Sequence, residues 1–233
     1  KSCFRRAKEG FVRLLGKDSA KAVQAALQVA IQLPSDDERI AEFRRLWEMA
    51  KVSLPEEAVT YAIANQLGNE LDEKGKYEEA KVFYLAALEG KRRVLGDERK
   101  DTLMSMDNMG TLLKKMEDYE GALDFYQQAN RVQEKVLGKT HPDTLKSIMN
   151  MAITYDVGLK DFTKAEEMFR LALDGHERSL GKDHHDTKEC AYNLAVSLAV
   201  TIKDKEKTRE LIKLYPHVQQ MQPLGWKIDR LLG

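Results

Sequence analysis

Three stretches of the chain repeat one another at a nearly fixed distance, and this repetition constrains the fold more than any other sequence feature. Each stretch has a glycine, then an Asp-Thr pair, then an asparagine, and the period is 42 and then 43 residues. The recurring positions are Gly96, Gly138 and Gly181, then Thr102, Thr144 and Thr187, then Asn108, Asn150 and Asn193. The additional residue of the longer period lies between Ala152 and Phe162. Periods of about 20 to 50 residues are typical of repeat arrays rather than of a single globular domain.

Each repeat is predicted to contain two amphipathic helices. In the second helix, two alanines flank one aromatic residue at spacings of four and three, which places all three on one helical face. These triplets are Ala80, Tyr84 and Ala87, then Ala122, Tyr126 and Ala129, then Ala165, Phe169 and Ala172. We expect this face to be buried, because small residues let a neighbouring helix approach closely while the ring fills the remaining space. Gly138 is expected to follow the end of one helix, and Pro142 to lie in the first turn of the next.

The chain is therefore predicted to be all-α, a single array of about five helix pairs whose end repeats are irregular. The expected order is a partial unit over 1–18, a degenerate helix pair over 19–53, repeats over 56–95, 98–137 and 141–180, a degenerate repeat over 184–215, and a capping helix over 217–233. In the degenerate pair, Ser35 and Glu38 have the spacing of a capping box.

The run Leu-Gly-Lys-Thr-His-Pro-Asp-Thr-Leu over 137–145 resembles the tetratricopeptide repeats of the kinesin light chain. Weaker copies lie at 95–103 and 180–188, and the resemblance extends over about residues 59–180. It implies a right-handed superhelix in which the first helices line a concave groove that binds extended peptide segments. The sequence has no sustained heptad pattern like the coiled coil by which a light chain joins its motor. This favours a light-chain-like repeat protein of another pathway.

The resemblance places the recurring asparagines in the peptide-binding groove, with Gln66 where a fourth asparagine would stand. An asparagine amide offers one acceptor and two donor hydrogens, so it can pair with both the N–H and the C=O of an extended peptide backbone. The predicted peptide-binding residues are Gln66, Asn69, Asn108, Thr111, Lys114, Lys115, Asn150, Ile153, Asn193 and Val196. The alternative is that the asparagines form hydrogen bonds within the repeats and have a structural role only.

The positions around the asparagines differ from repeat to repeat. They are Asn69, Asp72 and Glu73 in an acidic and polar repeat, Lys114 and Lys115 in a basic repeat, and Ile153, Val157, Val196 and Val200 in two apolar repeats. This gradient suits a ligand with an acidic part near the two lysines and an apolar anchor toward the C-terminal repeats. The alternative is that the charges form an ordinary solvated face.

Composition argues against several classes of partner. Lys plus Arg and Asp plus Glu both number 38, and this zero net charge argues against nucleic acid and anionic membranes, which require a concentrated basic surface. The apolar stretch 191–202 is interrupted by polar residues and is shorter than the roughly 20 residues of a membrane span. Cys3 and Cys190 cannot by themselves form a disulfide framework. We expect an intracellular protein, in the cytoplasm or, if a targeting segment has been removed before Lys1, in an organelle.

One cluster of residues in the sequence has the composition of a metal site. His184, His185 and Asp186 with Cys190 combine metal-ligating residue types at helical spacing, but they occupy the turn between repeats and are interpreted as turn and cap residues. The sequence has no catalytic signature and no glycine-rich phosphate loop, so we predict no catalytic residues, no metal and no cofactor.

The predicted function is that of a non-enzymatic interaction module, an adaptor or scaffold that binds an extended peptide segment of a partner protein in its concave groove. The alternative is a structural subunit of a larger assembly that docks through its convex or end surfaces. The sequence does not indicate an oligomeric state.

Overall fold

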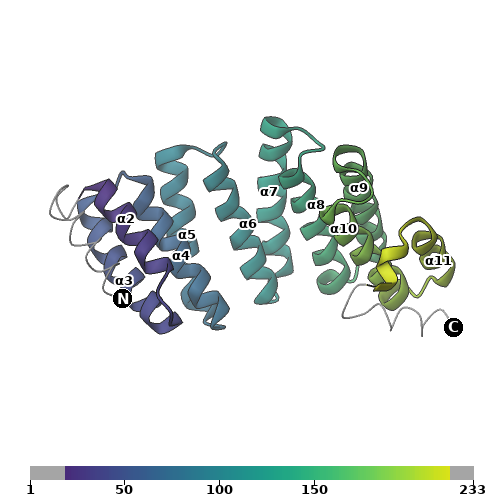
Figure 1. Cartoon of the computed structure of the whole chain (residues 1–233), viewed down its shortest axis with the longest axis horizontal. Coiled ribbons are helices and arrows are strands. Elements are labelled where there is room, and N and C mark those ends of the chain that lie inside the picture. Colours follow the sequence, from purple (N-terminus) through teal and green to yellow (C-terminus); the bar gives the residue numbers. More distant parts are fainter. Residues whose placement is uncertain (1–18, 221–233) are drawn as a thin grey trace. The chain divides into compact units, whose positions relative to one another are not determined.

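The computed structural model describes residues 19–220, and in this range the chain forms ten α-helices and no strands. The predicted all-α repeat fold is confirmed. The chain divides into two compact units, unit 1 ending at Met116 and unit 2 beginning at Glu117, and each is described by itself (Figure 1). The boundary lies between the two helices of the repeat expected over 98–137. The partial unit expected over 1–18, and residues 221–233 of the expected capping helix, lie outside the described residues.

Unit 1 contains five α-helices, and each of the first four packs against the helix that follows it. They are α2 (Ala20–Ile31), α3 (Asp36–Ser53), α4 (Ala58–Glu73), α5 (Tyr77–Leu95) and α6 (Lys100–Lys115). Ser19 caps α2, because its hydroxyl oxygen accepts a hydrogen bond from the Ala22 N–H at 3.2 Å. Ser35 has the N-cap position of α3, as predicted, but its side chain makes no capping hydrogen bond. The predicted capping box is therefore wrong.

Unit 2 has the same arrangement of successive packed helices, with two π-helical extensions. Its elements are α7 (Tyr119–Leu137), α8 (Pro142–Ile153) continued by η1 (Thr154–Leu159), α9 (Phe162–Leu180), α10 (His185–Val196) continued by η2 (Ser197–Ile202), α11 (Lys205–Leu214) and the 3-10 turn η3 (Pro216–Gln220). The expected capping helix therefore begins with a 3-10 turn, in which the Val218 N–H donates to the carbonyl oxygen of Tyr215.

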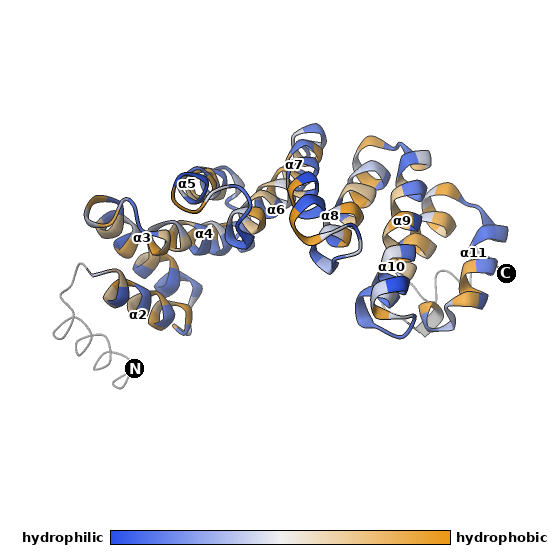
Figure 2. Ribbon diagram, turned by 90° about the horizontal axis from the view of Figure 1, so that it is seen from above, coloured by the Kyte–Doolittle hydropathy of each residue, from blue (hydrophilic) through white to orange (hydrophobic). Residues whose placement is uncertain are grey.

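The predicted alanine–aromatic face forms the core of both units. All nine residues of the three triplets are buried, and Tyr126 and both of its flanking alanines are 0 % exposed. In unit 1 the ring of Tyr84 packs directly on α4, so closely that a Cβ at Gly68 would lie 2.7 Å from the ring. Figure 2 shows hydrophobic residues concentrated on the sides of the helices that face their neighbours. The small residues thus allow the close helix contact that the sequence pattern predicts.

The recurring glycine and threonine build the turns between repeats. Gly138, at the end of α7, has a φ of 94°, a backbone conformation that favours glycine. Its carbonyl oxygen accepts a hydrogen bond from the Thr144 hydroxyl at 2.9 Å. The threonines at 102 and 187 bond the glycines at 96 and 181 in the same way, both at 2.8 Å. Pro142 lies at the first position of α8, as predicted.

The additional residue of the longer period is accommodated inside a helix. The first helix of this repeat continues as the π-helical turn η1, and π-helical turns hold one more residue than the corresponding α-helical turn. The next repeat has the same feature at η2, and both turns end at a lysine with positive φ, Lys160 at 58° and Lys203 at 61°. The first helices of these two repeats therefore differ in shape from α6 at their C-terminal ends.

Candidate functional site

The candidate amides of unit 1 are already engaged with other side chains. Asn108 on α6 donates from Nδ2 to Oδ1 of Asn65 on α4, at 3.2 Å. Asn69 donates to Oε1 of Gln66 at 2.9 Å and accepts a hydrogen bond from the Tyr84 hydroxyl at 2.7 Å. These contacts correspond to the structural alternative for the asparagines, at least in unit 1. Sequence reasoning missed Asn65. The equivalent positions in later repeats carry unrelated residue types, so the repeat pattern gives no signal for it.

The acidic and basic residues that the sequence places in neighbouring repeats form an ion pair within unit 1. The Lys115 ammonium lies 2.8 Å from both carboxylate oxygens of Asp72, whose side chain is only 12 % exposed. Burial, with a smaller effect of Lys115, lowers the pKa of Lys114, and both Lys114 and Thr111 have further interactions within the protein. The charge of Lys115 is thus offset by Asp72, which weakens the argument for an acidic ligand segment at this position.

The candidate amides of unit 2 have much weaker partners. Asn150 on α8 and Asn193 on α10 are both half-buried. The side-chain amide of Asn150 makes no hydrogen bond to any of residues 19–220. Asn193 donates from Nδ2 only to the thioether sulfur of Met149, at 3.7 Å, and a thioether is a weak acceptor. Both amides therefore keep most of their capacity to form hydrogen bonds.

Apolar side chains extend from both of these asparagines along their helices. Ile153 and Val196 follow three residues after the asparagines and are half-buried. Val157 on η1 is 56 % exposed and Val200 on η2 is 42 % exposed, although valine is usually buried. Each repeat of this pair thus places one amide and two aliphatic residues at equivalent positions.

A buried carboxyl group lies beside the exposed valine of η1. Asp156 is 7 % exposed, and its Oδ1 has no hydrogen-bond partner in the described part of the chain. Burial raises the pKa of this carboxyl group, while Ser197 and Thr201 of η2 and the charge of Lys160 oppose that effect. Sequence reasoning missed Asp156, and the only signal for it was the one-residue increase in period at this place.

A second polar position recurs in the second helices, facing the following first helix. In three repeats this position holds a buried residue, which is Lys91, Gln133 or His176. The position that it faces on the following first helix also recurs, as Ser105, Ser147 and Cys190. Lys91 donates to the Ser105 hydroxyl at 2.8 Å, and the Ser147 hydroxyl donates to Gln133 at 2.7 Å. The third repeat differs, because Nδ1 of His176 has no partner and the Cys190 thiol donates to a carbonyl oxygen, that of Phe169, at 3.6 Å.

His176 is expected to make the protein less stable in mild acid. Burial lowers the pKa of this imidazole, against the opposing charges of Asp186 and Glu189. Between the lowered pKa and the usual value of about 6.5, the unfolded chain binds more protons than the folded protein, so stability falls as the pH falls through this range. The variant His176→Gln carries the residue found at the same position in the previous repeat. We expect its urea midpoint to fall less between pH 7.5 and pH 5.5 than that of the wild type, and equal losses in both proteins would contradict this assignment.

The histidine-rich turn is a helix cap. Nδ1 of His184 accepts a hydrogen bond from the Asp186 N–H at 3.2 Å, and His141 bonds Asp143 in the same way at 3.1 Å. Burial raises the pKa of the Cys190 thiol to about 12, far from that of a nucleophilic thiolate. Within residues 19–220, no three His, Cys, Asp or Glu side chains are placed to hold a metal ion. The predicted cap role of His184 is confirmed.

None of the described helices is both long enough and apolar enough to cross a bilayer.

Successive packed helices with a period of 42 to 43 residues define an α-helical repeat protein. The family model of the tetratricopeptide repeat matches residues 59–135 and 115–174. The chain is a tetratricopeptide repeat protein, and the resemblance inferred from the run at 137–145 is confirmed. No curated protein matches the sequence.

Several solved structures share this fold at low sequence identity. BtubC (BKLC) from P. vanneervenii has a TM-score of 0.76 at 16 % identity, with 94 % of this chain and 89 % of that chain covered. A putative kinesin light chain with nearly identical repeats from Podosopora anserina has a TM-score of 0.68 at 17 % identity, covering 95 % of this chain and 98 % of that chain. YrrB, described as a tetratricopeptide repeat protein with an unusual peptide-binding site, has a TM-score of 0.62 at 19 % identity, covering 96 % of this chain and 100 % of that chain.

Proposed function

We propose that this protein is a non-enzymatic interaction module that holds an extended segment of a partner protein along the first helices of unit 2. Tetratricopeptide repeats are commonly protein–protein interaction modules, and YrrB is one with a peptide-binding site. The observation that carries the proposal is the unequal bonding of the recurring asparagines. Asn108 is paired with Asn65, whereas Asn150 has no partner among the described side chains and Asn193 has only a sulfur atom.

The spacing of the two helices suits an extended ligand. Packed helices lie about 8 to 10 Å apart, and an extended chain advances about 3.3 Å per residue. Asn150 and Asn193 would therefore meet backbone groups about three residues apart, each amide pairing with one N–H and one C=O. The aliphatic residues beside them, such as Ile153 and Val196, would contact apolar side chains of the same segment. We thus propose a peptide with apolar residues, and no required acidic part, as the ligand.

The test uses peptides selected from a random 12-residue library displayed on phage, with the whole chain as the bait. Binding of the best peptide is measured by fluorescence anisotropy for the wild type and for the double variant Asn150→Ala/Asn193→Ala. One protein hydrogen bond contributes about 1 kcal/mol net, so the loss of two to four bonds is expected to weaken binding at least tenfold. Asn108→Ala is the matched control and should change the affinity less than twofold.

Unchanged affinity in a double variant with the wild-type circular dichroism spectrum would reject the role of these amides. An equal loss in Asn108→Ala would instead indicate that the ligand also contacts unit 1, contrary to the proposal.

A further inference from the structure

Unit 2 contains a cavity of about 560 Å³ between the second helices α7 and α9, with α8 as its floor. The floor is formed by apolar side chains of α8, among them Leu145, Ile148 and Met151, and α9 contributes Met168 and Leu171. Leu171 is 51 % exposed although it lines the cavity. The volume lies within the roughly 300 to 1,000 Å³ of typical ligand pockets, whose walls are also mainly apolar. The groove residues Asn150 and Asn193 do not line this cavity.

The charges at the rim are largely offset by neighbours within the same unit. Lys139 lies 3.1 Å from Glu134, and Arg178 lies 3.1 Å from Asp174. Asn130 donates to the carbonyl oxygen of Thr144 at 3.0 Å. The cavity therefore suits an uncharged apolar group better than a carboxylate or an ammonium group.

Unit 1 shows what the chain itself places at the equivalent positions. Two periods earlier, Leu145 and Met168 have aromatic counterparts, Tyr61 and Phe83. Gly175 and Arg178 correspond to the same residue types, Gly90 and Arg93. The ring of Tyr61 packs directly against the backbone at Gly90 and contacts the Trp47 ring edge to face, with 6.4 Å between centroids. Trp47 in turn contacts Phe83 at 6.3 Å.

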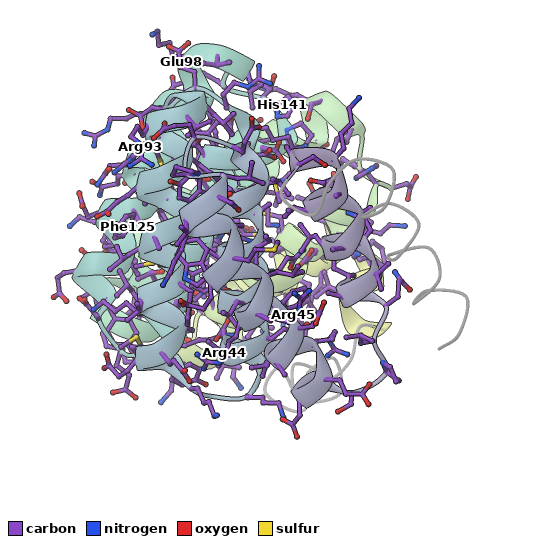
Figure 3. The ribbon with its side chains drawn as sticks, turned by 90° about the vertical axis from the view of Figure 1, so that its left-hand side faces the viewer. Arg44, Arg45, Arg93, Glu98, Phe125 and His141 are labelled. Atoms are coloured by element: carbon purple, nitrogen blue, oxygen red, sulfur yellow. The ribbon has the colours of Figure 1, made fainter. Side chains whose placement is uncertain are left out.

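An arginine completes this aromatic cluster in unit 1. The guanidinium carbon of Arg93 lies 5.7 Å from the centroid of the Tyr61 ring, and Arg93 also donates a hydrogen bond to the Tyr61 hydroxyl. Figure 3 shows Arg93 toward the upper end of this unit and Arg44, which lies over the Phe83 ring, toward the lower end. In unit 2, Arg178 has no such ring at the equivalent position, because Leu145 replaces the tyrosine.

We propose that the cavity between α7, α8 and α9 binds an aromatic side chain of a partner protein, which takes the place that the Tyr61 ring has in unit 1. The electron-rich face of a ring complements the guanidinium of Arg178, and rings bury about 150 to 250 Å² of surface each. A second copy of this chain would have to bury about 800 Å² per partner in a stable interface, far more than one such cavity provides. This site is separate from the groove of the proposed function and corresponds to docking through the second helices.

The direct test is methyl NMR on the whole chain with labelled methionines. Met151 and Met168 line the cavity, and Met106 and Met109, buried in unit 1, are internal controls. The probes are a Gly-Gly-Tyr-Gly-Gly peptide, the same peptide with leucine in place of tyrosine, and p-cresol. We expect the tyrosine peptide to shift the Met151 and Met168 signals saturably, with at least fivefold weaker binding of the leucine peptide and no shift of the control signals.

The decisive variant is Leu145→Tyr, which fills the cavity from within as Tyr61 does in unit 1. Gly175 leaves room for the ring, as Gly90 does, so we expect the thermal midpoint to be maintained and the peptide-induced shifts to be lost. A second variant, Arg178→Ala, changes a side chain that is 72 % exposed and should reduce the preference for tyrosine over leucine to less than twofold.

Three results would overturn the proposal. The first is the absence of saturable shifts of Met151 and Met168 in the wild type. The second is unchanged binding by folded Leu145→Tyr or, if that variant does not fold, by Arg178→Ala. The third is binding of p-cresol without binding of the tyrosine peptide, which would indicate a site for a small aromatic molecule. The double variant at Asn150 and Asn193 should leave the signal intact, so failure of the groove proposal is distinguishable from failure of this one.

Discussion

Replacing Tyr126 with alanine is expected to destabilise the protein by about 3 to 5 kcal/mol, the usual cost of deleting a buried aromatic side chain. Tyr126 is among the largest fully buried residues, and the alanines at 122 and 129 on either side are also 0 % exposed. Small neighbours cannot fill the volume left by the ring, so a cavity would remain beside α7. The loss should appear in urea denaturation followed by circular dichroism, as a lower unfolding free energy of the whole chain.

Two control variants test whether the loss of stability comes from the buried ring of Tyr126 itself. Tyr126→Phe keeps the ring and removes only the hydroxyl, so it should cost about 1 kcal/mol. Phe125→Ala removes an aromatic ring from the neighbouring, only partly buried position on the same helix, and should cost clearly less than Tyr126→Ala (Figure 3). If the two alanine variants were equally destabilised, the alanine–aromatic face would not be the core of the repeat.

The core and the turns could be predicted from the sequence because both depend on local geometry. A spacing of four and then three residues places side chains on one helical face in any context, so the burial of Tyr84, Tyr126 and Phe169 follows from their positions in the repeat. The turn between repeats is equally local, since the Thr144 hydroxyl reaches the Gly138 carbonyl oxygen six residues earlier. Ser35 shows the limit of such patterns, because a residue at the N-cap position need not use its side chain.

The hydrogen bonds of the candidate site could not be predicted in the same way. Asn108 and Asn65 are 43 residues apart, and their contact depends on how α4 and α6 lie against each other. Periodicity identifies the face on which an asparagine lies, but not whether a polar side chain of another repeat reaches it. The positions equivalent to Asn65 in later repeats carry aspartate, methionine and tyrosine, so the pairing of Asn108 with Asn65 is not a property of the repeat. This difference is what distinguishes the two units as possible sites for a peptide.

The π-helical turns could be predicted from the sequence only in part. The sequence locates one additional residue between Ala152 and Phe162, but an insertion can lengthen a loop as easily as it can widen a helix. The structure places it within the helix, where it forms η1 and leaves Asp156 buried beside an exposed Val157. The energetic balance between the two outcomes depends on packing against α9 and η2, which no local pattern records.

Gly90→Ala should be strongly destabilising, although the same change in most helix interiors is favourable. Alanine is normally preferred to glycine inside a helix by about 0.5 to 1 kcal/mol. A Cβ at position 90 would instead collide with Cδ1 and Cε1 of the Tyr61 ring. The ring cannot easily retreat, because Trp47 packs against it and Arg93 bonds its hydroxyl. Overpacking of this kind costs about 1 to 3 kcal/mol, so the sign of the usual preference is reversed.

A double-mutant cycle with Tyr61→Leu tests whether the collision is the cause. Leucine stands at the equivalent position 145 of unit 2, where it faces Gly175, so a helix pair of this fold accepts it. We expect Gly90→Ala to lower the unfolding free energy much less in the Tyr61→Leu background than in the wild type, giving a coupling energy of at least about 1 kcal/mol. Additive effects of the two substitutions would show that the glycine is required for another reason. They would also remove the basis for treating Tyr61 as the internal model of the ring that unit 2 is proposed to bind.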